Sequence, residues 1–134
     1  MRQWDKVSTD RRAGVHPDLL RLADAVLQAA PWPLRITEGM RTLERQKQLL
    51  AAKATKTLNS RHLTGHAIDV VPYIDLDRDG KIETEELYNK RLFDILIPIA
   101  KKEAERLNIK TTFGYDWGWD SPHWELDRRE YPAK

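Results

Sequence analysis

Two histidines and two aspartates carry the side chains in this chain best suited to metal chemistry. His62 and Asp69 share one short stretch, and Asp120 and His123 lie near the C-terminal end. Zinc in hydrolases takes three protein ligands and leaves a fourth position for water, whose pKa then falls to about 7. Two imidazoles and one carboxylate form such a ligand set, and the second carboxylate remains for proton transfer. The four residues therefore predict a catalytic zinc site.

Strand geometry decides which histidine accompanies Asp69. Side chains alternate between the faces of a strand, so Asp69 shares its face with Ala67 while His66 points away. His62 precedes Gly65 in a turn that can bring its imidazole back over the strand, so we expect His62 to be the ligand. The alternative is a pair of ordinary surface histidines beside a buried aspartate.

The C-terminal pair supplies the remaining two roles. The three-residue spacing lets His123 enter the metal sphere while Asp120 lies beside the water as a general base. The alternative for Asp120 is a turn former before Pro122. Arg41 carries planar donors that suit a developing oxyanion or a substrate carboxylate, although an arginine at a helix entry is more often a solvated charge.

A second metal motif occupies residues 75–86. The segment fits the twelve-residue EF-hand loop, with three early carboxylates, a turn glycine, a carbonyl donor, an acidic ninth position and a final bidentate carboxylate. In chain order these residues are Asp75, Asp77, Asp79, Gly80, Lys81, Glu83 and Glu86. We predict calcium binding here, against the alternative of a plain acidic turn. Because the loop follows the strand that carries Asp69, calcium is expected to activate or stabilise the protein.

Helices that would position these residues follow from apolar spacing and capping signals. An amphipathic pattern predicts a helix over 19–30 that ends before Pro31, and Thr42 is suited to cap the helix that follows it. A long helix is predicted over 84–107. Pro98 lies within it and is expected to kink the helix or split it in two.

Strands are predicted over 34–38 and 67–74, with the second of these at the centre of a sheet. Alternating aromatic and polar residues in 111–126 predict one or two strands of an antiparallel pair. Strands and helices that do not alternate regularly predict an α+β fold, with a small antiparallel sheet and flanking helices.

Size and composition limit the protein to a few classes. The 134 residues fit one domain spanning 1–134, with the loop at 75–86 inserted in it. Cysteine is absent, so disulfides and thiolate ligands are excluded. The net charge of +2 gives no reason to expect a nucleic-acid partner. We also expect a monomer that is made in the cytoplasm without a signal peptide and does not associate stably with membranes.

The motifs resemble those of a known family of zinc peptidases, which includes D-alanyl-D-alanine dipeptidases and carboxypeptidases. The matching pattern is Ser60-x-His62-x-x-Gly65-x-Ala67-x-Asp69, with Asp120-x-x-His123 and with Arg41-Thr42 followed by Gln46. Within that family the chain is most similar to the L-alanyl-D-glutamate peptidases that bacteriophages use as endolysins. The dipeptidase branch commonly carries glutamate in place of Asp120, and the shorter carboxylate favours the endolysin branch.

The resemblance implies the small α+β fold of D-Ala-D-Ala peptidases and hedgehog domains. It also implies that His62, Asp69 and His123 bind zinc, that Asp120 is the base and that Arg41 stabilises the transition state. The implied partner is the peptidoglycan stem peptide, reached from the host cytoplasm after another protein has permeabilised the membrane.

Four further residues are candidates for substrate binding: Ser60, Gln46, Trp117 and Trp119. Ser60 has the alternative of capping the turn before His62, and the tryptophans have the alternative of simple packing. Two other functions are retained as alternatives: cleavage of D-Ala-D-Ala as a carboxypeptidase or dipeptidase, and a non-catalytic calcium- and zinc-binding module.

Overall fold

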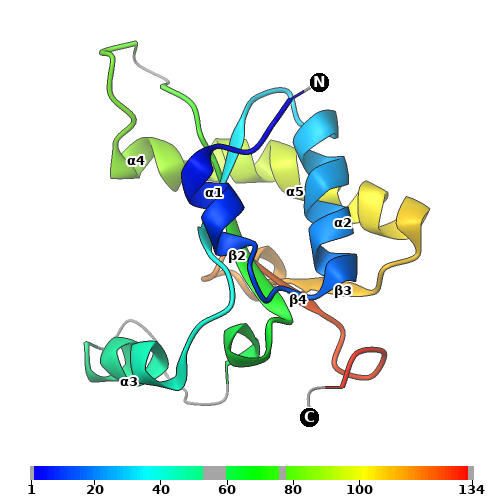
Figure 1. Cartoon of the computed structure of the whole chain (residues 1–134). Coiled ribbons are helices and arrows are strands. Elements are labelled where there is room, and N and C mark those ends of the chain that lie inside the picture. The colour runs from blue at the N-terminus through cyan, green and yellow to red at the C-terminus, as the bar shows by residue number, and fades with distance from the viewer. Residues whose placement is uncertain (1, 53–59, 76–77, 133–134) are drawn as a thin grey trace.

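Four short strands form one antiparallel sheet in the order β1-β2-β4-β3 (Figure 1). The computed structural model describes residues 2–52, 60–75 and 78–132. The strands are β1 (Leu34–Glu38), β2 (Ala67–Pro72), β3 (Thr111–Phe113) and β4 (His123–Leu126). This sheet and its flanking helices confirm the predicted α+β class. β2 is central as expected, and it ends at Pro72 rather than at residue 74.

The two faces of the sheet differ in character because side chains alternate along each strand. Ile68, Val70 and Trp124 point to one face and are fully buried. A fully buried side chain of this size contributes roughly 1.5–3 kcal/mol to folding. Asp69 and His123 are paired directly across β2 and β4 and lie on the opposite face. The hydrophobic face thus fixes which polar residues meet on the other side.

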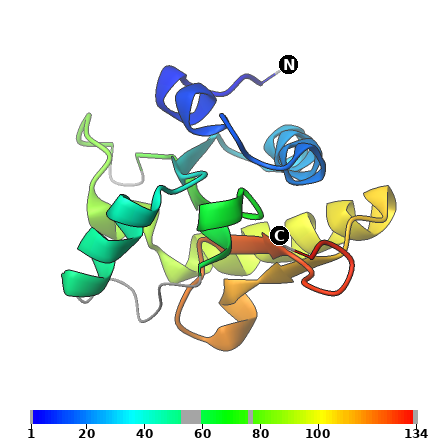
Figure 2. The ribbon, with the colours of Figure 1, turned by 60° about the horizontal axis from the view of Figure 1, so that its bottom comes forward.

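Helices α2 (Pro17–Ala29) and α5 (Lys90–Leu107) pack on each other, and α5 also contacts β2 and β3. Figure 2 shows α5 running along the sheet. α2 is capped by His16 at its start and by Ala30 at its end, immediately before Pro31, which confirms the predicted helix. The core of the protein lies between these two helices and the apolar face of the sheet.

Helix α3 (Leu43–Ala51) begins where the sequence predicts, because the Thr42 hydroxyl accepts a hydrogen bond from Arg45 N at 3.1 Å. Helix α1 (Lys6–Arg11) was not predicted. Its six residues are too few to show a helical period, and it depends on Asp5, whose carboxylate accepts hydrogen bonds from Ser8 N and from Arg35 on β1, each at 2.8 Å.

The predicted long helix over 84–107 is divided at a different residue from the one expected. α4 (Thr84–Leu87) ends before Asn89, whose side chain caps α5 by accepting a hydrogen bond from Arg91 N. α5 then continues through Pro98 without a break, so the expectation of a split there was wrong. Pro98 is exposed, as is Asp94, whose carbonyl loses its partner in the helix, so water can replace the missing donor.

A one-turn 3-10 helix, η1 (Arg61–Thr64), leads into β2, and a second, η2 (Gly114–Trp117), follows β3. Gly65 ends η1 with φ +76°, a left-handed conformation that favours glycine. A Cβ atom at Gly65 would lie 2.2 Å from Gly14 O, so the tight approach of the two segments also requires glycine.

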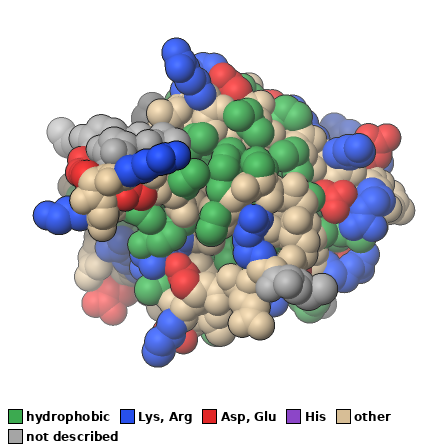
Figure 3. Space-filling view, turned by 90° about the horizontal axis from the view of Figure 1, so that it is seen from above, with side chains coloured by type: hydrophobic (Ala, Val, Ile, Leu, Met, Phe, Trp, Pro, Cys, Tyr) green, Lys and Arg blue, Asp and Glu red, His purple; other side chains and the backbone are tan. Residues whose placement is uncertain are grey.

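Hydrophobic side chains gather at the centre of the face shown in Figure 3, and side chains of both charges lie around them. Within the described part of the chain, no helix combines the length and the apolar character needed to cross a bilayer.

Candidate active site

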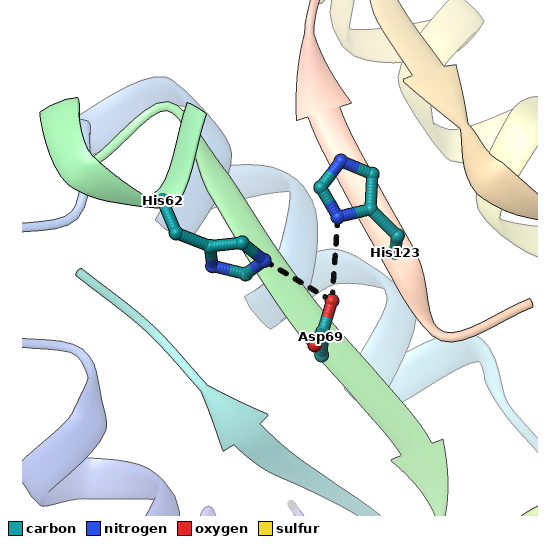
Figure 4. A group of neighbouring side chains, drawn as sticks. All are labelled: His62, Asp69 and His123. Atoms are coloured by element: carbon teal, nitrogen blue, oxygen red, sulfur yellow. Dashed lines mark ion pairs between the residues drawn. The ribbon is translucent and has the colours of Figure 1, made fainter. Parts of the chain in front are cut away.

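Three side chains from three separate elements converge on the polar face of the sheet (Figure 4). His62 comes from η1, Asp69 from β2 and His123 from β4. Asp69 Oδ1 lies 3.3 Å from His62 Nε2 and 3.4 Å from His123 Nδ1. One potential ligand atom from each residue lies within 4.8 Å of the other two, so the group could hold a metal ion.

The turn before β2 places His62 over the strand. Ser60 Oγ accepts a hydrogen bond from His62 N at 3.2 Å and caps η1, which is the alternative role considered for this serine. Gly65 then reverses the chain into β2. His66 lies outside the cluster, and its Nδ1 is 2.7 Å from Thr64 Oγ1. The turn thus separates the two histidines of the motif, and only His62 reaches Asp69.

In both histidines of the cluster, the ring nitrogen that faces away from Asp69 has a hydrogen-bonding partner. His62 Nδ1 lies 2.9 Å from Gly39 O, and His123 Nε2 lies 2.9 Å from Glu125 Oε1. Each ring therefore presents its other nitrogen to Asp69. Glu125 was not identified from the sequence, although its position two residues after His123 on a strand, hence on the same face, was a usable signal.

The ionisation of the cluster follows from burial and mutual contact. Burial raises the pKa of Asp69, but the imidazoles of His123 and His62 outweigh burial and hold that pKa well below its usual range. Burial lowers the pKa of His123, but Asp69 and Glu125 outweigh burial and raise it to about 9. Without a metal, the site is therefore an ionised aspartate beside a protonated His123 at neutral pH.

Asp120 lies at the edge of the cluster, with Oδ2 3.9 Å from His123 Nδ1 and with a third of its side chain exposed. Burial and then the charge of Asp69 raise the pKa of Asp120, and the positive groups nearby only partly oppose this rise. A carboxylate whose pKa is raised accepts a proton more readily near neutral pH. Gly114 permits the arrangement, because a Cβ there would lie 2.2 Å from Asp120 O.

Arg41 is buried beside the cluster and is held by several contacts. Its backbone N donates to His62 O at 2.8 Å, and its Nη1 donates to Gln46 Oε1 at 2.7 Å. Its Nε lies 3.3 Å from Glu38 Oε1, without the geometry of a hydrogen bond. Gln46, which was predicted to bind substrate, is fully buried, and its Oε1 accepts the hydrogen bond from Arg41.

Two tryptophans extend from the cluster toward solvent. The Trp117 ring centroid lies 5.3 Å from that of His123 and 5.5 Å from that of Trp119. Trp117 is 40% exposed and Trp119 is 72% exposed. Packing alone does not account for so much exposed aromatic surface beside a polar cluster.

Tyr88, which the sequence did not single out, lies within electrostatic reach of the same site. Burial and then the charges of Asp69 and Asp120 raise the pKa of Tyr88 above its usual value. Its phenol is therefore protonated at neutral pH and can donate a hydrogen bond at the edge of the cluster.

A second acidic group forms in the loop after β2. Carboxylate oxygens of Asp75, Asp79 and Glu86 lie within 4.8 Å of one another. Asp75 Oδ2 accepts a hydrogen bond from Gly80 N at 2.8 Å, and Gly80 has φ +87° as the sharp turn requires. The predicted ligand Asp77 lies outside the described residues.

The backbone also shapes this loop at its other predicted positions. Asp79 Oδ1 accepts a hydrogen bond from Lys81 N at 2.8 Å, and Glu86 Oε1 accepts one from Glu83 N at 3.0 Å. Glu86 is 7% exposed, and α4, the helix that contains it, packs against β2. The acidic loop and the strand of Asp69 are therefore in physical contact.

Buried carboxylate oxygens that form no hydrogen bond indicate where cations fit. Among the described residues, the two buried carboxylate oxygens with no hydrogen bond are Asp69 Oδ1 and Asp75 Oδ1. A buried carboxylate oxygen without a hydrogen bond is costly, and a bound cation lowers that cost. Two nitrogens and one oxygen suit zinc, whereas an all-oxygen group suits calcium.

Comparison with known proteins identifies the class: the chain is a peptidase. A family model described as phage L-alanyl-D-glutamate peptidase matches residues 2–133, so the chain belongs to that family. This confirms the resemblance noted in the sequence motifs.

Two relatives are similar over most of their length. The L-alanyl-D-glutamate peptidase of Escherichia phage T5 is 32% identical over 134 residues, which span 96% of this chain and 92% of the relative. The crystal structure of the Serratia marcescens L-Ala D-Glu endopeptidase ChiX matches with a TM-score of 0.80 at 31% identity. That match covers 96% of this chain and 92% of the ChiX chain.

Proposed function

We propose that this protein is a zinc-dependent endolysin that hydrolyses the L-alanyl-D-glutamate bond in the stem peptides of peptidoglycan. The bond specificity is taken from the two relatives, whose names state it. The observation that carries the zinc proposal is Asp69 Oδ1, a buried oxygen without a hydrogen bond that lies between two imidazole nitrogens. We propose His62, Asp69 and His123 as the ligands.

When bound, zinc would act as a Lewis acid on the scissile carbonyl and would lower the pKa of water at the site. In this proposal Asp120 takes the proton of the attacking water and passes it to the leaving amine. Its raised pKa suits both transfers, because the protonated form must also be accessible. Asp120 thus acts as the general base and general acid at the edge of the cluster.

Arg41 would stabilise negative charge on the carbonyl oxygen in the transition state. Gln46 and Glu38 hold the guanidinium in place, so less conformational freedom is lost when substrate arrives. We propose Trp117 and Trp119 as the apolar wall of the substrate groove, and we place Ser60 at its entrance.

Muropeptide digestion followed by mass spectrometry tests the bond and the metal together. Purified sacculi treated with the zinc-loaded protein should yield glycan chains whose muramic acids keep only L-alanine, together with peptides that begin with D-glutamate. Protein treated with a chelator should be inactive until zinc is added back. Release of D-alanine instead would identify a D,D-peptidase, and full activity after chelation would refute the zinc site.

We further propose that the loop at 75–86 binds calcium and supports the active site. The support is the buried oxygen Asp75 Oδ1 without a hydrogen bond, next to carboxylates of Asp79 and Glu86. Asp77, the Lys81 carbonyl and Glu83 are proposed to complete the ligand set. An ion here would tie β2 to α4, and Tyr88 directly follows α4.

Calcium titration at constant zinc tests this proposal. Turnover and melting temperature should both rise as calcium saturates the loop. An unchanged melting temperature would refute binding, and a raised melting temperature with unchanged turnover would limit calcium to stabilisation.

A further inference from the structure

Glu125 is a buried carboxylate that the proposed reaction does not use. It lies on β4 with only 6% of its side chain exposed. Its two oxygens have different partners: Oε1 lies 2.9 Å from His123 Nε2, and Oε2 accepts a hydrogen bond from Arg128 Nε at 3.2 Å. A carboxylate is costly to bury, so its placement here calls for a reason.

The ion pair with Arg128 does not by itself provide that reason. Two thirds of the Arg128 side chain is exposed, and ion pairs that reach solvent contribute little to stability. The contact with His123 is different, because both side chains are buried there. The imidazole is therefore the buried hydrogen-bonding partner of Glu125, while the buried guanidinium of Arg61 interacts with Glu125 through its charge.

Strand geometry fixes this contact. His123 and Glu125 lie two residues apart on β4 and share a face. Across the sheet Glu125 is paired with Ala67 and with Thr112, whose small side chains leave room beside it. An imidazole that donates Nε2–H to Glu125 has its Nδ1 lone pair free, and Nδ1 points toward Asp69 Oδ1 at 3.4 Å.

We propose that Glu125 is a positioning residue, which holds His123 in the orientation and tautomer that present Nδ1 to the metal, with Arg128 holding the far oxygen of Glu125. This inference rests on the proposed zinc site. It assigns no contact between Glu125 and the metal or the substrate. Carboxylates behind metal-binding histidines commonly act in this way, and their loss weakens metal binding about 10- to 100-fold.

The chain offers a matched control in Glu103, which pairs with Arg106 at the same three-residue spacing and at 3.0 Å, but on α5. If Glu125 served only as a partner for an arginine, removal of either glutamate would have the same small effect on zinc binding. The comparison therefore separates a positioning role from a structural one.

Zinc affinity, measured by competition with a chromophoric chelator, tests the proposal on the full chain. Glu125→Leu should raise the zinc dissociation constant about 10- to 100-fold, while Glu103→Leu should leave it unchanged. Glu125→Gln keeps an oxygen that accepts a hydrogen bond from Nε2–H, so this variant should lose clearly less zinc affinity than Glu125→Leu. Wild-type affinity in a folded Glu125→Leu variant would overturn the proposal, as would equal losses in the Gln and Leu variants.

A spectroscopic measurement keeps the test decisive if Glu125→Leu does not fold. In zinc-loaded wild-type protein and in Glu125→Gln, the Nε2–H proton of His123 should appear as a protected downfield resonance in the NMR spectrum. Its absence from the zinc-loaded wild type would overturn the proposal. Failure of the wild type to bind zinc at all would instead refute the proposed function.

Discussion

Zinc binding should depend steeply on pH, because His123 must lose a proton before it can bind a metal. Asp69 and Glu125 raise the pKa of His123 to about 9 in the metal-free protein, in spite of its burial. Only the neutral imidazole is a ligand. At neutral pH the ion therefore competes with a bound proton. Asp69 adds nothing to this competition, because its pKa is held well below its usual range.

The size of the effect follows from that pKa. Each pH unit below the pKa of a ligand lowers the apparent metal affinity about tenfold. At about pH 9 only half of the His123 imidazole is protonated, so between about pH 9 and about pH 7 the dissociation constant for zinc should rise about 50-fold, and about one proton should be released per ion at the lower pH.

Isothermal titration calorimetry in two buffers with different ionisation enthalpies measures both quantities. His66→Gln is the matched control, because His66 lies outside the cluster and should leave the proton release unchanged. A dissociation constant that does not vary with pH, together with no proton release, would refute the reasoning.

The stability of the metal-free protein should fall as the pH rises, whereas its zinc affinity should increase. The folded pKa of His123, about 9, lies above the unfolded value of about 6.5. A raised pKa contributes stability that is fully present below about pH 6.5 and is lost as the pH rises through about 9. The melting temperature of chelated protein should therefore fall over that window, as scanning calorimetry can measure.

Three substitutions test other parts of the structure. Asp120→Asn should lower kcat/KM about 10²- to 10⁴-fold because the proton acceptor is lost, and should leave zinc affinity near that of the wild type. Glu86→Gln should abolish the calcium-dependent rise in melting temperature, which for the wild type corresponds to about 2.7 kcal/mol at a calcium concentration of about 100 times Kd. Gly65→Ala should lower the free energy of unfolding by more than about 1–2 kcal/mol in urea titrations, because a left-handed φ and a clash with Gly14 O coincide.

Each substitution has a control or an outcome that would contradict it. Retention of most activity in Asp120→Asn would exclude it as the base. An undiminished rise in melting temperature with calcium in Glu86→Gln would show that calcium binds at a different site. Gly118→Ala is the control for Gly65→Ala, since Gly118 has φ +86° but no atom near the added Cβ. Equal losses in the two variants would show that the clash with Gly14 is unimportant.

Much of the fold could be predicted because its signals are local. The period of α2, the cap at Thr42 and the β-rich run of β2 each lie within a few residues. Helix α1 could not be predicted in this way, since its stability depends on a contact between Asp5 and Arg35 on β1. The break at Asn89 was missed because Pro98 is the stronger local signal, yet exposure makes that proline tolerable.

In the candidate site too, some features could be predicted from the sequence and others depend on tertiary contacts. The motif alone indicated that His62, Asp69 and His123 should meet, and the side chains do converge. Glu125 was missed although its two-residue spacing from His123 on β4 was a signal, whereas Tyr88 could not be selected because its pKa depends on burial and on the charges of Asp69 and Asp120 from other elements.

The amino-acid sequence by itself determined the chemistry that is available: the ligand types, the spare carboxylate and the spacing of the acidic loop. Only the tertiary structure decided how these groups are oriented and ionised. The pairing of β2 with β4 sets Asp69 against His123, and the backbone at Gly39 and the carboxylate of Glu125 turn the two imidazoles inward. The physical reason is that orientation and pKa depend on distance in space and on burial, and neither is a property of neighbouring residues in the chain.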